Sequence, residues 1–274
     1  MAKPNTLFVD IEDAFAAGMA YVMLSRVCSL DQLIILGTLK SSKIRVDPKV
    51  LNEVKRMEEV SVNRNPTIWN SSVPGMRVSS INVRSLRKHL EDVKKDFFLM
   101  RSDLVCIEET WLEPEEDENV YQIEGYTSHL NSQGRGKGLA IYIKKNKFRH
   151  VMDLRSPYMQ ITKVTSERMD VISVYRSQEE SFLSLKNKVE SLIDPNKTTL
   201  VVGDFNFCYK TSQNEFSSFM SKSKFNQLVE AATHIEGGLL DHAYFKSVGD
   251  EREATVELCS NYYSDHDTLT VFIP

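Results

Sequence analysis

The sequence predicts an α/β fold in which sheets pack inside layers of helix. From about residue 76 to the C-terminus, short apolar runs typical of strands alternate with segments whose apolar residues recur at helical spacing. Acidic, turn-forming motifs close or follow three of the strand-like runs, and such mixed elements favour sheets enclosed by helices. With 274 residues, the chain is long enough to bury a sizeable core in one or two domains.

The expected elements follow one another in order. The first strand spans residues 77–83, and a helix over 86–100 follows because its apolar residues lie three or four positions apart. Further strands are expected at 103–108, 138–144, 160–164, 170–175, 198–203, 239–245 and 268–273. Further helices are expected at 182–193 and over most of 214–232.

The N-terminal part differs in character. Residues 14–27 are expected to form an amphipathic helix and residues 33–37 a short strand. The stretch 58–75 is polar, contains two prolines and shows neither a helical nor an alternating period, which indicates a linker. The expected organisation is therefore a segment over 1–57, a linker over 58–75 and a main domain over 76–274.

Composition limits the possible classes. The hydrophobic fraction of 41% and the charged fraction of 26% are typical of a soluble globular protein. A net charge of -4 gives no overall basic signature, although nucleic-acid binding depends on local patches. The cysteines lie far apart without metal-ligand spacing, so we expect reduced thiols and a nuclear or cytoplasmic location. No signal peptide or membrane span is evident, and no membrane partner is expected.

Three short acidic motifs point to phosphodiester chemistry. They are Ile107-Glu108-Glu109-Thr110, Gly203-Asp204-Phe205-Asn206 and Ser264-Asp265-His266. Cleaving a phosphodiester requires neutralisation of charge on the phosphate oxygens, activation of water and stabilisation of the leaving oxygen. Mg²⁺ suits this task and prefers one or two carboxylates together with waters and substrate oxygens. The joint presence of the motifs predicts a metal site of this kind.

The first two motifs carry distinct candidate roles. Glu109 stands where a strand ends and can point into a cleft, whereas Glu108 faces the other way by the two-residue period of a strand. Alone, Glu109 would be a solvated acid that begins a loop. Asp204 and Asn206 are two positions apart and can share a direction, which would let them hold a water and a phosphate oxygen. Alone, they are as readily an Asx-turn.

The remaining candidates are weaker one by one. His266 beside Asp265 is more often a surface histidine, and Asp241, which precedes His242, is more often an exposed acid at a strand end; it could orient a histidine across the site. Asn82 is polar inside the first strand, and a buried Asn needs partners. Tyr175 at the end of its strand is more often a core aromatic than a phosphate ligand.

One glycine-rich segment looks like a phosphate-binding loop but does not qualify. Residues 134–138 read Gly-Arg-Gly-Lys-Gly, without the Ser or Thr after Lys and without the preceding strand that a P-loop requires. We therefore expect a loop with basic decoration, in which Arg135 and Lys137 could touch a DNA backbone.

Residues 76–274 resemble the endonuclease/exonuclease/phosphatase superfamily, which includes abasic-site endonucleases, DNase I and retrotransposon endonucleases. The resemblance rests on Ser80–Leu86, Cys106–Leu112, Val174-Tyr175-Arg176, Leu240-Asp241-His242 and the motifs at 203–206 and 264–266. Thr233–Gly238 is similar to the mobile-element branch. The resemblance implies a four-layer αββα sandwich of the DNase I type, with the site at one end of the paired sheets.

The same resemblance implies roles for the metal and the water. Glu109 would bind Mg²⁺ or Mn²⁺, assisted by Asp265. Asp204 and Asn206 would position or activate the attacking water. Whether Asp204 or His266 removes the proton stays open.

The resemblance also implies roles at the phosphate. His266 together with Asp241 would contact the scissile phosphate, while Tyr175 and Asn82 would support the phosphate and Glu109. The expected activity is metal-dependent nicking of DNA that leaves a 3′-hydroxyl. The alternatives are a phosphodiesterase acting on small molecules, lipids or protein–DNA adducts, and a catalytically decayed DNA-binding remnant.

The chain departs from the family pattern at three positions. Some members carry an acidic or amide ligand two residues after the opening Asn, where this chain has Arg84. Abasic-site enzymes have an Asn where this chain has Gln178, and Glu108 replaces the usual Gln. A second metal site and the level of activity therefore stay open.

Residues 18–30 resemble the last motif of superfamily-one DNA helicases, close to the petite-integration-frequency group, and residues 34–48 continue the resemblance. It implies that Arg26 corresponds to an arginine finger on ATP. The chain contains no Walker A sequence, so we expect no ATP binding. The simpler interpretation is a small packing appendage. A helicase tail before such an endonuclease is expected of Helitron-like transposons, which makes the chain similar to the C-terminal remnant of a mobile-element protein.

Overall fold

The computed structural model divides the chain into two compact units, Met1–Glu59 and Val60–Pro274. It describes residues 7–10, 16–24, 26, 32–38, 40–52, 55, 68, 73–144, 148, 150–249 and 253–274. Most of the predicted linker lies outside these residues, so its bounds stay a prediction. No helix in the described ranges is long and apolar enough to cross a membrane.

The smaller unit combines a parallel strand pair with one short helix. Strand β1 (Leu7–Asp10) pairs with β2 (Leu33–Leu36), and α1 (Met19–Leu24) contributes Ala20 to a small apolar cluster around Val9. A single turn of 3₁₀ helix, η2 (Ser41–Lys43), follows. Strand β2 and helix α1 lie where strand and helix are expected, and β1 was not predicted. The outer parts of the expected helix 14–27 fall partly outside the described residues.

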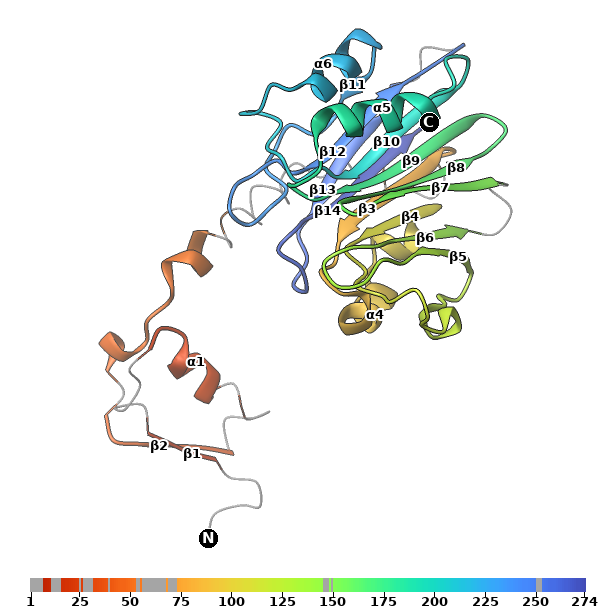
Figure 1. Ribbon diagram of the computed structural model, residues 1–274. Coiled ribbons are helices and arrows are strands. Elements are labelled where there is room, and N and C mark those ends of the chain that lie inside the picture. Colours follow the sequence, from red (N-terminus) through yellow and green to blue (C-terminus); the bar gives the residue numbers. More distant parts are fainter. Residues whose placement is uncertain are drawn as a thin grey trace. The chain divides into compact units, whose positions relative to one another are not determined.

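The larger unit is built on two sheets. The first has the order β13 (Thr255–Cys259), β14 (Thr268–Ile273), β3 (Met76–Asn82), β4 (Leu104–Glu108), β6 (Leu139–Lys144) and β5 (Tyr126–Asn131). The second has the order β11 (Asn226–Gln227), β12 (Asp241–Lys246), β10 (Thr198–Asp204), β9 (Met169–Arg176), β8 (Met159–Thr165) and β7 (His150–Ser156). Figure 1 shows the two sheets stacked face to face.

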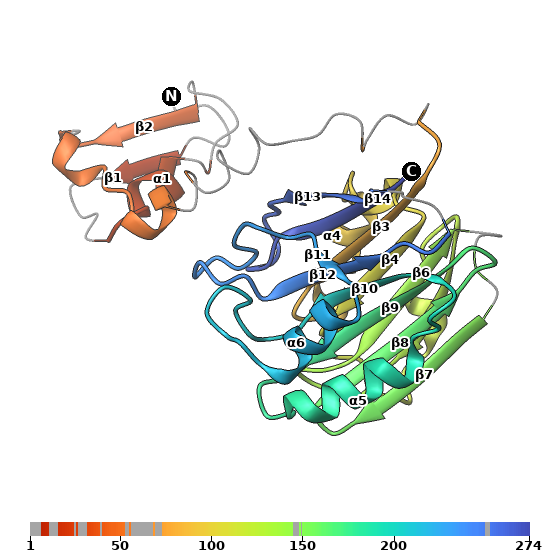
Figure 2. The same cartoon turned by 90° about the horizontal axis from the view of Figure 1, so that it is seen from above.

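Helices cover the outer face of each sheet. Figures 1 and 2 show α5 (Phe182–Leu192) and α6 (Glu215–Lys222) over the second sheet, and α4 (Leu86–Lys95) on the far side of the first. The 3₁₀ turns η3 (Leu99–Arg101) and η4 (Glu118–Tyr121) belong to this latter layer. The predicted four-layer αββα arrangement is therefore confirmed.

Strand alternation divides the core into three clusters. Cys106 packs between the sheets, whereas its neighbour Val105 packs with Val93 of α4. In the second sheet Val171 packs between the sheets and Ile172 packs with the residues of α5 and α6. Because consecutive strand residues face opposite sides, both faces of the central strands are apolar, which explains their nearly continuous hydrophobic runs.

The predicted helix over 214–232 is too long. Helix α6 ends at Lys222, Lys224 adopts a left-handed φ of 63°, and the chain continues into β11 beside β12. Phe225 and Val229 are buried at a four-residue spacing that imitates a helix, but they come from an extended segment. The helix expected over 86–100 likewise stops at Lys95, where the Asp96 side chain accepts hydrogen bonds that start η3.

Four strands of the larger unit were not predicted: β5, β7, β11 and β13. Each lies at an edge of its sheet. Edge strands have one free side and carry polar residues, so their alternation is weak in the sequence. Cys106, Cys208 and Cys259 are free thiols, as expected.

Candidate active site

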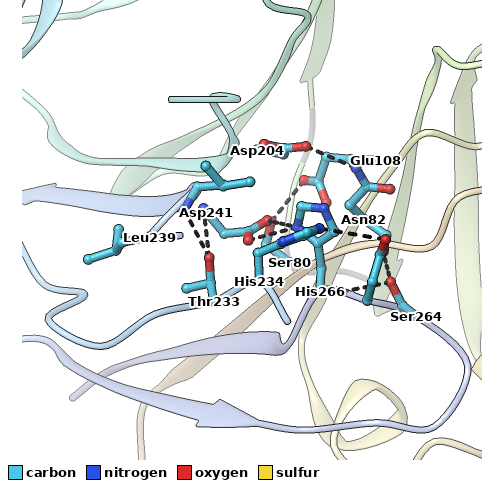
Figure 3. A network of polar contacts seen from close by, with 12 residues as sticks. Ser80, Asn82, Glu108, Asp204, Thr233, His234, Leu239, Asp241, Ser264 and His266 are labelled. Carbon is cyan, nitrogen blue, oxygen red and sulfur yellow. Dashed lines mark hydrogen bonds and ion pairs between the residues drawn. The ribbon is translucent and has the colours of Figure 1, made fainter. Parts of the chain in front are cut away.

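The predicted residues meet because several strands end at one end of the paired sheets. In the second sheet, register places Tyr175 of β9 beside Asp204 of β10, and Asp204 beside Asp241 of β12. In the first sheet Asn82 ends β3 opposite Glu108, the last residue of β4. Figure 3 shows the side chains of Asn82, Asp204 and Asp241 converging from the two sheets.

Asn82 links the two sheets. Its Nδ2 donates to Oε1 of Glu109 at 3.0 Å and to Oδ2 of Asp204 at 2.9 Å. Its Oδ1 accepts the backbone N–H of Arg84 at 3.1 Å. Only 1% of Asn82 is exposed. These hydrogen bonds satisfy its buried amide, which explains how a polar residue can lie inside the strand.

Glu109 is held by several donors from different elements. Besides Asn82, the hydroxyl of Tyr175 lies 3.2 Å from its Oε1, and the indole Nε1 of Trp111 donates to its Oε2 at 3.1 Å. The Tyr175 hydroxyl also lies 2.9 Å from the carbonyl oxygen of Gly136, so its one proton is shared between two acceptors. Burial and the charge of Glu109 raise the pKa of Tyr175 well above its ordinary value, which keeps it a neutral donor.

Glu108 has different surroundings from its neighbour. It is fully buried, its Oε1 accepts a hydrogen bond from Ser80 Oγ at 2.8 Å, and its Oε2 has no partner among the described residues. Burial, reinforced by the charges of Asp241 and Asp204, raises the pKa of Glu108 well above its ordinary value. Its surroundings therefore favour the neutral form of the Glu108 carboxyl.

Asp204 and Asn206 form both the Asx-turn and part of the site. The backbone N–H of Asn206 donates to Oδ1 of Asp204 at 2.8 Å, and its Nδ2 donates to Oδ2 at 3.1 Å. Burial raises the pKa of Asp204 to about 7; the charge of His266 opposes this shift and the charge of Asp241 adds to it. A carboxylate that titrates near neutral pH suits proton transfer at that pH.

Gly203 allows the strand that carries Asp204 to approach its neighbour. Its φ is +142°, and a Cβ built there would lie 1.9 Å from the carbonyl oxygen of Val174 on β9. No side chain fits at that distance. Glu109 and Asn206 also have left-handed φ values, of 49° and 50°, which indicates that the turns following two strands are held in strained conformations at the site.

His266 and Asp241 form a buried pair. Nδ1 of His266 lies 2.9 Å from Oδ2 of Asp241, and the two side chains are 6% and 2% exposed. Burial opposes protonation of the ring, but the charge and hydrogen bond of Asp241 outweigh it and raise the pKa of His266 to about 10. Thr233 Oγ1 accepts the backbone N–H of Asp241, and Ser264 Oγ accepts that of His266 (Figure 3). The ring is thus a fixed cation near the carboxylate of Asp204.

The neighbouring His242 has a structural role. Its ring stacks on Phe205 at 4.8 Å, it contacts the hydroxyl of Tyr244, and it is fully buried. Burial lowers the pKa of His242 to about 4, which keeps it neutral.

Asp265 interacts with two residues that the predicted site did not include. Nη1 of Arg84 lies 2.5 Å from its Oδ2, and Nε2 of His234 lies 3.6 Å from the same oxygen. Burial works against its ionisation, but His234 and Arg84 hold the pKa of Asp265 well below its usual range. The ring of His234 also lies 4.8 Å from that of His266. The sequence signals for these residues were the Thr233–Gly238 segment and the departure at position 84.

The carboxylates of the site are candidate metal ligands. Side-chain ligand atoms lie within 4.8 Å of one another in two described groups, Asp204–Asp241–His266 and His234–Asp265–His266. Both groups include His266, whose raised pKa means that a cation bound there would have to displace its proton. Glu109 instead offers the two hard oxygens of its carboxylate, which three hydrogen-bond donors orient. These oxygens keep lone pairs that no donor uses. Such oxygens fit Mg²⁺. A metal role for Asp265 stays a prediction.

Comparisons with known proteins identify the fold. The endonuclease domain of TRAS1, a telomere-specific non-LTR retrotransposon, matches with a TM-score of 0.56 and 13% identity over 73% of this chain and 98% of its own. A 3′–5′ exonuclease (NExo) from Neisseria meningitidis matches with a TM-score of 0.58 and 18% identity, over 72% and 98%. An AP endonuclease from Archaeoglobus fulgidus matches with a TM-score of 0.54 and 18% identity, also over 72% and 98%.

These similarities concern the fold, and no curated protein matches the sequence. The profile of the Endonuclease/Exonuclease/phosphatase family matches residues 79–266, a span that contains the three acidic motifs and all eight predicted site residues. The chain belongs to the Endonuclease/Exonuclease/phosphatase family.

Proposed function

We propose that this chain is a Mg²⁺-dependent endonuclease that nicks DNA and leaves a 3′-hydroxyl. The observation that carries the proposal is one connected set of contacts: Glu109 is joined to Asp204 through Asn82, and the His266–Asp241 pair lies beside it. Membership of the family indicates the class of reaction, which is phosphodiester hydrolysis. Members of this family typically depend on a metal. A metal bound at Glu109 would neutralise charge on the phosphate oxygens.

The protonation states favour one division of labour. His266 is already protonated at neutral pH, so it serves as a donor to a phosphate oxygen through Nε2–H rather than as the base. Asp204, whose pKa lies at about 7, accepts the proton of the attacking water. The side chain of Asn206, fixed on Asp204, orients that water. Tyr175 contributes a neutral hydroxyl that holds Glu109 in place.

DNA as the substrate is supported by the glycine-rich loop. The guanidinium of Arg135 lies 5.7 Å from the ring centroid of Trp111, and Lys137 Nζ lies 5.5 Å from that of Tyr158. The hydroxyl of Tyr175 contacts the backbone of Gly136, which ties this loop to the site. Cations interleaved with aromatic rings suit a nucleic-acid strand. The likeness to the TRAS1 endonuclease domain favours the same substrate class.

Incubation with supercoiled plasmid and Mg²⁺, followed by mapping of the ends, tests the proposal. We expect nicks with 3′-hydroxyl termini that disappear in Asp204→Asn. Asp194→Asn is the matched control, because Asp194 lies in the loop before β10, at the opposite end of that strand. Cleavage of small phosphodiesters, lipids or protein–DNA adducts alone would favour the alternative substrates. Metal and DNA binding without turnover would indicate a decayed remnant.

We also propose that residues 1–57 derive from a helicase and that the protein is of mobile-element origin and acts in the nucleus or cytoplasm. The support for a helicase origin is the resemblance of residues 18–30 to a helicase motif. The chain contains no Walker A sequence. We expect residues 1–57 to bind no ATP, and their deletion to leave nicking largely intact. ATP-dependent nicking, or a folded but inactive deletion protein, would show that the two parts are functionally coupled.

A further inference from the structure

Arg84 is placed at the site by a strained turn. It follows Asn82 by two residues and has a left-handed φ of 46°. Its backbone N–H donates to Oδ1 of Asn82, so the same amide that joins Glu109 to Asp204 also fixes this turn. A non-glycine residue rarely adopts this conformation without compensation. The compensation here is a side chain that reaches Asp265, 181 residues further along the chain.

The contact occupies an acid that would otherwise attract a cation. Oδ2 of Asp265 lies 2.5 Å from Nη1 of Arg84 and 3.6 Å from Nε2 of His234. A carboxylate oxygen that a guanidinium and an imidazole already share is a poor ligand for a divalent ion, because like charges would crowd around one oxygen. The guanidinium thus already neutralises the charge that Asp265 would offer to a second ion, and the buried Oδ1 of Asp265 has no hydrogen-bond partner among the described residues.

Arg84 also keeps donors available for a ligand. Its side chain is 55% exposed, and its contact with Asp265 is made through a single nitrogen in the described structure. A guanidinium offers further N–H groups in a planar fork that matches a phosphate. Besides Asp265, the acid Glu109 and the hydroxyl of Tyr175 lie close enough to contribute to its electrostatic surroundings. The free donors therefore belong to the same site as the proposed metal ligand.

We propose that Arg84 supplies the second positive charge of this site, where it neutralises Asp265 and contacts a phosphate of the substrate, and that Glu109 holds a single divalent ion. The inference rests on the proposed function for the identity of the substrate. It goes beyond that function because it sets the number of ions and assigns a phosphate contact to an arginine.

Counting ions without substrate tests the first half. In a Mn²⁺ titration of the full chain followed by electron paramagnetic resonance, we expect one bound ion. Arg84→Met should bind a second ion or bind Mn²⁺ about tenfold more tightly, because it removes the repulsion of a neighbouring unit charge. Arg87→Met is the matched control, because Arg87 is also exposed but pairs with Glu116. Two ions in the unaltered protein, or identical titrations for the two variants, would overturn the inference.

Binding of a short DNA duplex in EDTA tests the second half. A plot of the logarithm of the DNA association constant against the logarithm of the salt concentration has a negative slope. That slope should become shallower by about 0.9 in Arg84→Met, which corresponds to the loss of one phosphate contact. Arg101→Met should keep the slope, because Arg101 precedes β4 and the site lies where β4 ends. An unchanged slope in Arg84→Met would show that Arg84 makes no phosphate contact. Neither measurement uses turnover, so a protein that binds one ion and cleaves nothing refutes the proposed function and leaves the role of Arg84 standing.

Discussion

Gly203→Ala should destabilise the larger unit far more than an ordinary substitution of glycine. The new Cβ would lie 1.9 Å from the carbonyl oxygen of Val174, and contacts under 3.0 Å are essentially never observed. Strands β9 and β10 must therefore separate locally by at least 1.1 Å, which is 3.0 Å minus 1.9 Å. A ladder hydrogen bond of ordinary length does not survive such a displacement.

The magnitude follows from three contributions. Loss of one or two ladder bonds costs about 1 kcal/mol each. A side chain at φ +142° adds strain of about 1–3 kcal/mol. Overpacking between two buried strands adds about 1–3 kcal/mol. The expected loss is about 3–8 kcal/mol of the free energy of unfolding, which is a large part of the roughly 5–15 kcal/mol that stabilises a typical domain.

Gly125→Ala separates the steric effect from the backbone effect. Gly125 also has a left-handed φ, of +83°, but nothing lies within 4 Å of a Cβ placed there. It should cost only about 1–2 kcal/mol. Urea unfolding followed by tryptophan emission measures both variants, and plasmid nicking reports the displacement of Asp204, which follows Gly203. Free energies of unfolding that differ by less than about 1 kcal/mol between the two variants would refute the steric argument.

Three further predictions concern side chains of the site. Glu109→Gln should abolish most nicking at low Mg²⁺ and recover in part at high Mg²⁺, since weakened coordination is a mass-action defect; activity unchanged at every Mg²⁺ concentration would assign the metal to another acid. His266→Ala and Asp241→Asn should each be severe and the double variant little worse than the worse single one, whereas multiplicative losses in folded proteins would mean that the two act independently. Glu108→Gln should stabilise the protein increasingly as pH rises, by about 1–3 kcal/mol at alkaline pH. The raised pKa of Glu108 means that its protonated form stabilises the fold below the unfolded pKa, and that this contribution is lost as pH rises through the folded pKa; urea midpoints with the same pH dependence in both proteins would contradict it.

Much of the fold could be predicted because burial leaves a periodic trace in the sequence. The central strands β3, β4, β9, β10 and β14 are covered on both faces, and their apolar runs located them to within a residue or two. The edge strands and the end of α6 were not predicted correctly, because burial leaves a weak or misleading pattern there. An edge strand alternates weakly, and Phe225 and Val229 reach the core from an extended segment that has the spacing of a helix.

The sequence by itself pointed to eight residues that the structure brings to one end of the paired sheets, because they lie in short motifs at the ends of strands. Only the tertiary structure decided how they work. It brought Asn82 to Asp204 across the two sheets and Arg84 to Asp265 across 181 residues, contacts that depend on sheet packing and that no local pattern records. It also decided that the pKa values of His266 and Glu108 are both raised, which favours a charged imidazole and a neutral carboxyl, because the pKa of a side chain depends on its burial and on the charges that surround it.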